Sequence, residues 1–268
     1  MLTVENLRFS YVRGQDIMKD VTFTIGNGEF ITLGGRNGCG KTTVTRLLVG
    51  LETPVEGKIS YDGQDITHMP TSERGRFIGY VFQQPDRQMF RQTVAEEVAF
   101  GPEQLGYDKA TVDRIVQDAL ERVGISHLAE SYPLGLRRGE KQRVAIASAL
   151  AMQSKLLILD EPTSGQDGTE TKGLLVLLQE LQAQGLTILL ITHDMEIMAE
   201  YSTRVIIMGY GTKAFDGSPE ELFTSREDLL ELGLTKPPSV VLSETVLALG
   251  YCKSMKEFEL RYAEHVKG

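Results

Sequence analysis

A glycine-rich segment near the N-terminus constrains the fold of this chain more than any other feature. It reads Gly35-Arg36-Asn37-Gly38-Cys39-Gly40-Lys41-Thr42, follows the apolar run 29–33 and precedes a helical pattern over 42–49. The segment matches the phosphate-loop pattern at every fixed position and in the required strand–loop–helix context. Glycines let backbone N–H groups turn inward around phosphates, and the following helix N-terminus favours negative charge. The segment therefore predicts a nucleotide-phosphate site.

Two side chains at the end of this loop have specific predicted roles. Lys41 is expected to reach the β- and γ-phosphates, and the Thr42 hydroxyl to ligate Mg²⁺. Cys39 occupies a variable position and is interpreted as a small filler residue, whereas Arg36 adds a positive charge to which the sequence assigns no role. The predicted nucleotide-binding residues of the segment are Gly35, Asn37, Gly38, Cys39, Gly40, Lys41, Thr42 and Thr43.

A second apolar run, 156–159, ends in Asp160 and Glu161. A carboxylate at the C-terminal edge of a strand can hold Mg²⁺, which suits Asp160. Glu161 points elsewhere and can orient and polarise an attacking water. Together with the phosphate loop, this pair predicts nucleoside triphosphate hydrolysis. Lys41 and Asp160 are 119 residues apart, too far for a minimal nucleotide-kinase core, so we expect an inserted domain.

The remaining patterns predict an α/β fold. Continuous apolar runs are typical of parallel strands that are buried on both faces. The alternation of apolar and polar residues over 21–25 predicts a half-buried strand. The segment 57–64 predicts a strand that enters a hairpin turn at Asp62-Gly63. The predicted buried strands are 29–33, 156–159, 187–191 and 205–208, and the predicted helices are 42–49, 112–123, 171–181 and one that starts at Ser218-Pro219.

Composition excludes several classes of protein. The chain has 268 residues, 41% of them hydrophobic, which is enough apolar material for one large or two modest domains. Its net charge of −9 argues against a nucleic-acid binder, which normally shows a basic face. Cys39 and Cys252 lie far apart and indicate a reducing compartment.

The sequence gives no sign of insertion into a membrane. No apolar run approaches the roughly 20 residues that span a bilayer. The first residues, MLTVENLRFSY, lack the basic head and apolar stretch of a signal peptide. We therefore expect a cytosolic chain that serves a membrane only through its partners.

Further motifs, taken in order, resemble the ATP-binding cassette (ABC) ATPases from Leu2 to about Phe223. Val81-Phe82-Gln83-Gln84-Pro85 is similar to the Q-loop of that family, and Ser164-Gly165-Gln166-Asp167 to its D-loop. Ile191-Thr192-His193-Asp194 is similar to the switch-histidine loop, and Tyr11 stands where the family places an aromatic ring against adenine.

The resemblance implies a role for each matched residue. Gln83 links Mg²⁺ and the attacking water to the helical insertion, His193 contacts the γ-phosphate, and Asp167 communicates across a dimer interface. Glu161, His193, Lys41 and Gln83 form the implied catalytic set, and Thr42, Gln83 and Asp160 the implied metal set, with ATP and Mg²⁺ as the ligands.

The resemblance also implies the architecture. It is an α/β fold of the P-loop (RecA-like) class, an ABC nucleotide-binding domain over 1–223 with an antiparallel β subdomain. A helical subdomain is inserted at about 84–153. Residues 224–268 form a mainly helical C-terminal tail, which we expect to pack on the core or on a partner.

Within the family, the chain most resembles the ATPases of energy-coupling factor (ECF) importers, which take up vitamins and metal ions. The residues that carry this resemblance are 83–90, which read QQPDRQMF, and 93–101, which read TVAEEVAFG. The resemblance implies a transmembrane coupling protein and a substrate-binding membrane component as partners. It places the chain at the cytoplasmic face of the cell membrane as a peripheral subunit that binds no nucleic acid.

The family signature, Leu-Ser-Gly-Gly-Gln, is altered in this chain. The downstream segment 141–147 fixes the register, and the signature positions read Leu136-Arg137-Arg138-Gly139-Glu140. Arginines replace the serine and the first glycine, so a hydroxyl is lost and two cationic side chains are added. In one interpretation the chain pairs with a second ATPase of intact signature in an asymmetric heterodimer, which we favour. In the other, Arg137 replaces the serine by charge contact with a γ-phosphate in a homodimer.

Three other functions are weighed against an ECF importer ATPase. The chain could serve another ABC importer class, or be a regulatory subunit that mainly binds ATP. The altered signature motivates the second, whereas intact Lys41, Asp160, Glu161 and His193 argue against it. A soluble ABC protein of DNA repair or translation would carry coiled-coil insertions or tandem cassettes, and neither is evident here.

Overall fold

A computed structural model describes residues 1–12, 14–226, 228–246 and 249–267. Over these ranges the strands form a four-stranded antiparallel sheet and a six-stranded mixed sheet. The four-stranded sheet has the order β2-β1-β4-β5, and its strands are β1 (Leu2–Phe9), β2 (Met18–Ile25), β4 (Glu56–Tyr61) and β5 (Gln64–Asp65). The six-stranded sheet has the order β10-β9-β3-β8-β7-β6, and its strands are β3 (Phe30–Gly35), β6 (Ile78–Val81), β7 (Leu156–Asp160), β8 (Thr187–Ile191), β9 (Arg204–Gly209) and β10 (Thr212–Gly217).

The four predicted buried runs become the parallel centre of the six-stranded sheet. β9 pairs with β3, β3 with β8, and β8 with β7, all in parallel. Successive β7 residues face opposite layers: Ile158 packs toward the four-stranded sheet, whereas Leu157 packs toward the helices on the other side. Burial on both faces explains why these runs are apolar throughout. β6 and β10, at the two edges of the sheet, were not predicted.

Helices cover both faces of the six-stranded sheet. The helix α1 (Lys41–Val49) shares one apolar cluster with the four-stranded sheet, and the helices on the opposite face form another with β7 and β8. The helices of that opposite face are α3 (Val94–Gln104), α4 (Lys109–Arg122), α5 (Arg138–Ala151) and α6 (Gly168–Ala183). The others are α2 (Thr71–Arg74), α7 (Met195–Tyr201), α8 (Pro219–Ser225), α9 (Pro238–Thr245) and α10 (Met255–Lys267), with short 3₁₀ turns at Pro85–Gln88, Ser126–Leu128 and Pro133–Gly135.

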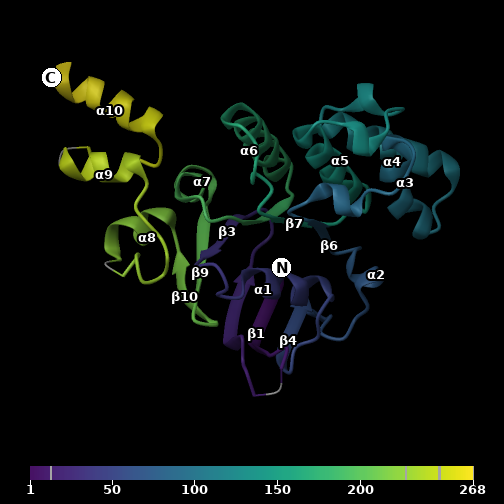
Figure 1. Cartoon of the computed structure of the whole chain (residues 1–268), viewed down its shortest axis with the longest axis horizontal. Helices are drawn as coiled ribbons and strands as arrows, with labels where there is room; N and C mark the ends of the chain where they lie inside the picture. The colour runs from purple at the N-terminus through teal and green to yellow at the C-terminus, as the bar shows by residue number, and fades with distance from the viewer. Residues whose placement is uncertain (13, 227, 247–248, 268) are drawn as a thin grey trace.

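The helical insertion and the C-terminal helices lie at opposite ends of the molecule. α3, α4 and α5 gather at one end and pack on one another, whereas α8, α9 and α10 lead away at the other (Figure 1). One apolar cluster joins β9 and α8 to later residues of the chain: Leu229, Leu232, Leu234 and Val240. The C-terminal segment thus packs on the core, and the domain boundary at 223 stays a prediction.

One predicted turn and one predicted helix start are present with the backbone geometry that their residues favour. Asp62 and Gly63 both have positive φ, +47° and +82°, as a tight hairpin turn between β4 and β5 requires. Ser218 caps α8 by accepting a hydrogen bond from the N–H of Glu221, and Pro219 occupies the first helical position.

A buried arginine fixes the far end of α1. The Arg74 side chain is 2% exposed, and its guanidinium donates to carbonyls of Leu47 and Leu48 at 2.6 and 2.9 Å. It also donates to the carbonyls of Met69 and Thr67, at 2.9 and 2.7 Å. Since the last carbonyls of a helix have no partner within the helix, these bonds satisfy them and lock the orientation of α1.

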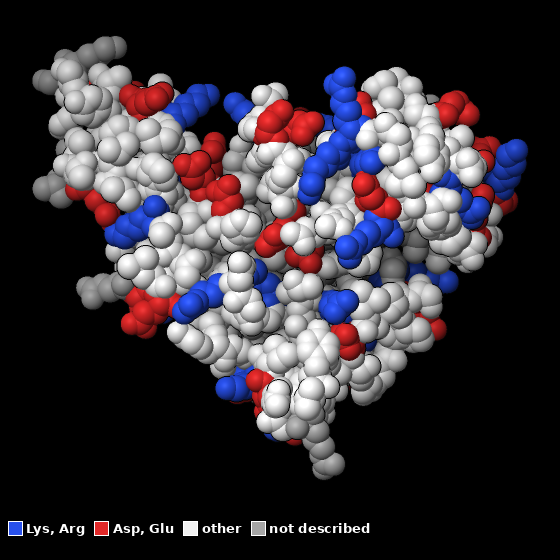
Figure 2. All heavy atoms as spheres, viewed as in Figure 1, with Lys and Arg blue, Asp and Glu red and all other residues white. Residues whose placement is uncertain are grey.

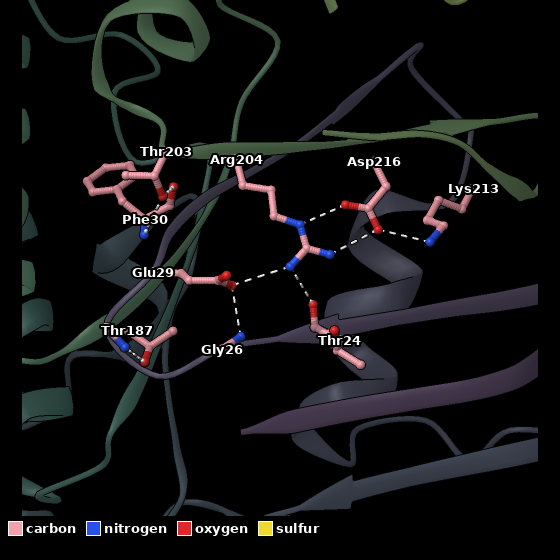
Figure 3. Close-up of polar contacts among 10 residues, drawn as sticks. Thr24, Gly26, Glu29, Phe30, Thr187, Thr203, Arg204, Lys213 and Asp216 are labelled. Carbon is pink, nitrogen blue, oxygen red and sulfur yellow. Dashed lines mark hydrogen bonds and ion pairs between the residues drawn. The ribbon is translucent and has the colours of Figure 1, made fainter. Parts of the chain in front are cut away.

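An ion-pair network joins the two sheets (Figure 3). Arg204, the first residue of β9, forms a bidentate pair with Asp216 of β10 at 2.7 and 3.0 Å. Its guanidinium also donates to Glu29, at 3.4 Å, and to the carbonyl of Thr24 in β2, at 3.1 Å. Lys213 adds a second donor to Asp216 at 2.9 Å. One side chain therefore ties β2, the turn before β3, and β10 together.

Candidate functional site

The phosphate loop runs from the end of β3 to the start of α1. Two of its positions have a backbone geometry that favours glycine. Gly35 has φ +127°, and a Cβ atom there would lie 2.2 Å from the carbonyl oxygen of Met208. Gly40 has φ +105° and precedes the first residue of α1. A side chain at Gly35 would clash with the backbone of Met208, whereas at Gly40 it would strain the backbone, because its positive φ favours glycine. The predicted phosphate loop therefore has the positive-φ backbone geometry that its glycines make possible.

Lys41 lies inside this loop. Its side chain is buried, and the Nζ atom donates to the carbonyl oxygens of Gly35 at 2.8 Å and of Arg36 at 3.1 Å. The amine thus lies at the centre of the loop, where a phosphate group would be expected. Cys39 is also buried, and burial raises the pKa of its thiol, which agrees with a packing role rather than a redox role.

Three loops at the C-terminal edge of the six-stranded sheet bring Gln83, Glu161 and His193 together. The amide Nε2 of Gln83 donates to Oε2 of Glu161 at 2.9 Å. The other carboxylate oxygen, Oε1, lies 3.2 Å from Nδ1 of His193. These residues follow β6, β7 and β8 respectively, so parallel pairing of those strands places their ends side by side. Glu161 is held from both sides, as a group that orients a water molecule needs to be.

Asp160 lies beside Glu161 but in a different environment. It ends β7, is buried, and accepts a hydrogen bond from the hydroxyl of Tyr80 at 3.1 Å. Burial raises the pKa of Asp160, while hydrogen bonds from Tyr80 and Thr42 oppose that rise. The Thr42 hydroxyl and the Asp160 carboxylate therefore face each other, and oxygen ligands of this kind suit Mg²⁺.

Tyr80 is a site residue that the sequence analysis missed. It lies in β6, its hydroxyl is 3.5 Å from Thr45 of α1, and burial strongly raises its pKa. The neutral phenol thus bridges α1 and Asp160. The four-residue strand, Ile78–Val81, is too short to give a clear period. Its position just before the Q-loop was the only available signal.

The altered signature forms the N-terminus of α5. The backbone N–H of Arg137 donates to the Glu140 carboxylate at 2.9 Å, so Glu140 caps the helix start. Both arginine side chains are exposed. The guanidinium of Arg138 lies over the D-loop of its own chain: a Cβ atom at Gly165 would be 2.9 Å from its Nη1 atom. Gly139 follows it, close to the Glu170 side chain of α6.

Asp167 and Tyr11 are the two remaining predicted site residues. Asp167 caps α6, with its carboxylate accepting from the N–H groups of Thr169 and Glu170 at 2.8 Å each. Tyr11 is 51% exposed and packs edge-on against Phe9, with ring centroids 4.8 Å apart. Its ring is thus accessible to a ligand. The dimer-interface role of Asp167 and the adenine-binding role of Tyr11 stay predictions.

The motifs and their arrangement agree with a known family. A family model described as "ABC transporter" matches residues 18–164, more than half of the 268 residues. The chain belongs to the ABC transporter family. The predicted resemblance to ABC ATPases is thereby confirmed.

Several curated ABC proteins are similar over nearly the whole chain. A putative ABC transporter ATP-binding protein of Pyrococcus horikoshii is 37% identical over 96% of this chain and 97% of its own length. The energy-coupling factor transporter ATP-binding protein EcfA2 of Symbiobacterium thermophilum is 39% identical over 87% and 82%. The chain is also 40% identical to a putative ABC transporter ATP-binding protein of Methanosarcina acetivorans, but there it spans only 40% of that longer protein.

Solved ABC structures share the fold. CbiO1 of Clostridium perfringens, part of the ABC transporter complex cbiONQ, has a TM-score of 0.78 and 35% identity, and the match covers 87% of this chain and 94% of that one. The ATP-binding cassette MJ0796, solved as a dimer bound to ADP and Pi, has a TM-score of 0.71 and 27% identity, over 82% and 99%. The predicted ABC nucleotide-binding fold is confirmed.

The structure describes no helix that is both long and apolar enough to span a bilayer.

Proposed function

We propose that this chain is the ATP-hydrolysing subunit of a membrane importer of the ECF type, for a vitamin or a metal ion. The observation that carries the proposal is the Glu161 carboxylate. It is hydrogen-bonded to Gln83 at 2.9 Å and to His193 at 3.2 Å, next to a phosphate loop that holds Lys41 at its centre. This is a water-activating carboxylate placed beside a phosphate cradle.

The residues of the chain divide the chemistry among them. Glu161 orients a water molecule and accepts its proton at a carboxylate oxygen as the water attacks the γ-phosphorus. His193 and Lys41 stabilise the charge that develops on the phosphate oxygens. Thr42, Asp160 and Gln83 are the residues that would hold Mg²⁺. When bound, that ion neutralises charge on the β- and γ-phosphates.

Relatives support the ECF assignment and its partners. EcfA2 of Symbiobacterium thermophilum and EcfA of Methanosphaera stadtmanae, which is 38% identical over 88% of this chain, are named as energy-coupling factor ATPases. CbiO1 is named as part of a transporter complex. By analogy, this chain binds a transmembrane coupling protein and, through it, a substrate-binding membrane component, at the cytoplasmic face of the membrane.

The altered signature supports an asymmetric heterodimer. MJ0796 was solved as a dimer with ADP and Pi, and its architecture motivates pairing between two cassettes here. In this chain the Arg138 guanidinium packs against Gly165 of the same chain. An arginine held in that way is poorly placed to contact a nucleotide bound by a partner subunit. The serine and glycine of an intact signature would make that contact. The phosphate loop of this chain then hydrolyses ATP against a partner of intact signature.

The Glu161→Gln variant tests the proposed function. The amide keeps the shape of the side chain but cannot accept the proton, so we expect Mg²⁺-ATP binding to remain and turnover to fall by about 100-fold or more. The exposed Glu180 of α6 provides the control Glu180→Gln, which should keep wild-type turnover. Turnover of Glu161→Gln close to wild type would remove Glu161 from the mechanism.

The altered signature favours a second candidate, a regulatory subunit that occludes ATP with little hydrolysis. A single-turnover assay of the chain with its partner ATPase separates the two. Conversion of the ATP bound to this chain within one cycle supports the hydrolytic subunit. Persistence of intact ATP at its phosphate loop supports the regulatory one.

A further inference from the structure

A turn in the C-terminal segment, residues 228–234, packs on β9 of the six-stranded sheet. Leu229, Leu232 and Leu234 are 5%, 6% and 1% exposed and belong to the apolar cluster that contains Val205 and Ile207 of β9. Burial of three leucine side chains against the sheet holds the turn in one position. We refer to residues 228–234 as the tail turn.

The tail turn ends at a glycine with a left-handed backbone. Gly233 has φ +73°. The N–H of Leu234 donates to the carbonyl of Leu229 at 2.8 Å, and the N–H of Gly233 to that of Leu230 at 3.1 Å. This pair of bonds is the Schellman arrangement that closes a helical turn, and its left-handed position favours glycine.

The same glycine touches the phosphate loop. A Cβ atom at Gly233 would lie 2.2 Å from Cγ of Arg36 and 3.2 Å from its Cα and Cβ. The tail turn thus packs on both the backbone and the side-chain stem of Arg36. The Arg36 carbonyl, in turn, accepts from Nζ of Lys41 at 3.1 Å and from the N–H of Cys39 at 3.2 Å. The tail turn therefore contacts the residue whose carbonyl accepts hydrogen bonds from both Cys39 and Lys41 of the loop.

A second contact from the same cluster reaches the residue before the loop. Met198 of α7 is fully buried and belongs to the same apolar cluster as Leu232 and Leu234. Its Cε atom would be 2.5 Å from a Cβ atom at Gly34, which immediately precedes Gly35. The cluster therefore supports the phosphate loop on both sides of Gly35.

From these contacts we propose that the tail turn is a positioning element of the nucleotide site. It fixes the backbone of Arg36 and with it the carbonyl that holds Lys41, so nucleotide affinity depends on a segment about 200 residues away in sequence. Arg36 acts here through its place in the loop, which gives this residue a role that the sequence did not. The proposal rests on the proposed function only in that nucleotide binds at the phosphate loop, and it does not require hydrolysis.

The Gly233→Ala variant of the full chain tests this coupling. The added Cβ pushes Arg36 aside, and we expect affinity for the fluorescent analogue trinitrophenyl-ATP with Mg²⁺ to fall about tenfold, since small misplacements of binding groups are costly. The matched control is Gly106→Ala. Gly106 has a similar φ, +80°, but no atom would lie within 4 Å of the added Cβ, so the control carries the backbone strain without the contact.

A double-mutant cycle adds specificity to the test. Arg36→Ala removes the Cγ atom that lies closest to the new Cβ, so the effects of Gly233→Ala and Arg36→Ala on affinity should fall short of additivity by at least about threefold. Equal affinities for Gly233→Ala and Gly106→Ala, or strict additivity in the cycle, would overturn the proposal. Nucleotide affinity is measured without hydrolysis, so the result for Glu161→Gln does not affect it. The proposed function and the proposed role of the tail turn can therefore be rejected independently.

A measurement on the wild-type chain covers the case in which Gly233→Ala does not fold. Amide hydrogen exchange is compared with and without Mg²⁺ and trinitrophenyl-ATP. We expect bound nucleotide to slow exchange over the tail turn, residues 228–234. Unchanged exchange there, with slowed exchange over residues 35–42, would show that the tail turn is uncoupled from the site.

Discussion

At the scale of single residues, the backbone of Glu161 differs from that of its neighbours in β7. Its φ is +46°, in the left-handed region, which costs a side-chain-bearing residue on the order of 1 kcal/mol. The N–H of Glu161 donates to the carbonyl of Ile191 at 3.0 Å, which helps to hold this geometry. The Glu161 carboxylate contacts Gln83 and His193, whereas the Asp160 carboxylate contacts Tyr80. Two adjacent acids can therefore have different roles.

A second residue-scale feature is the guanidinium of Arg138 over Gly165. We expect Arg138→Ala to speed amide hydrogen exchange of residues 163–167 several-fold in the isolated chain, because the side chain that packs on this loop is gone. Arg137→Ala is the control, since Arg137 immediately precedes the same helix and is likewise exposed, and it should leave this exchange unchanged.

The same pair of variants tests whether Arg138 acts within its own chain. If Arg138 instead served only a partner's nucleotide, the isolated Arg138→Ala chain would exchange like the wild type. Its effect would then appear only in the assembled, nucleotide-bound complex.

At the scale of secondary-structure elements, α1 is fixed at both ends by contacts distant in sequence. Arg74 binds carbonyls of Leu47 and Leu48 at its C-terminal end, and the glycines of the phosphate loop shape its N-terminal end. Since the N-terminus of α1 faces the predicted phosphates, a change in its orientation would move the binding groups directly. Arg74 thus supports the site without touching it.

The network around Arg204 in Figure 3 makes a prediction about stability and pH. Burial alone raises the pKa of Asp216, but hydrogen bonds and charge contacts from Arg204 and Lys213 outweigh it and lower the pKa overall. A lowered carboxylate pKa stabilises the folded state above the ordinary value near 4, and this contribution is lost as the pH falls through the folded-state pKa. Asp216→Asn should therefore cost about 2 kcal/mol of unfolding free energy at pH 7 and much less below pH 4.

Urea unfolding from pH 3 to pH 8 measures this effect. The exposed Asp113 of α4, which forms no ion pair among the described residues, provides the control Asp113→Asn, and its stability should follow the wild type at every pH. A constant difference between Asp216→Asn and wild type across this range would mean that the network contributes no ionisation-linked stability.

At the scale of the whole molecule, charge is distributed without a large basic patch on the face viewed in Figure 2. Lysine and arginine side chains are interspersed with aspartate and glutamate there, and the net charge is −9. Nucleic-acid binders normally show a basic face, and the absence of a nucleic-acid partner stays a prediction. The helical insertion lies at the opposite end from α10 (Figure 1).

The partners proposed for the whole molecule can be identified by gentle purification of the tagged chain from native membranes. We expect a second ATPase with an intact signature and a small polytopic membrane protein to co-purify in fixed ratio. A tagged Glu180→Gln chain should recover the same set. Recovery of this chain as the only ATPase would support a homodimer, and recovery of no membrane protein would contradict the importer.

The parts of the fold that could be predicted are those with local signals. The buried strands β3, β7, β8 and β9 were evident because burial on both faces requires an apolar run. The edge strands β6 and β10 were not, since β6 is four residues long and β10 is half-buried with no clear period. The candidate site followed the same rule: motif residues were found, whereas Tyr80 and Arg74 were not, because their partners are 80 and 26–27 residues away.

The sequence by itself determined the phosphate loop, the order of the motifs and the α/β class. Each depends on residue types that a local backbone geometry or a two-sided burial requires. Only the tertiary structure decided that Gln83 and His193 hold Glu161, that Arg138 lies on its own D-loop, and that Gly233 packs on Arg36. These contacts join segments that are distant along the chain, and they exist only after the sheet and its helices have packed.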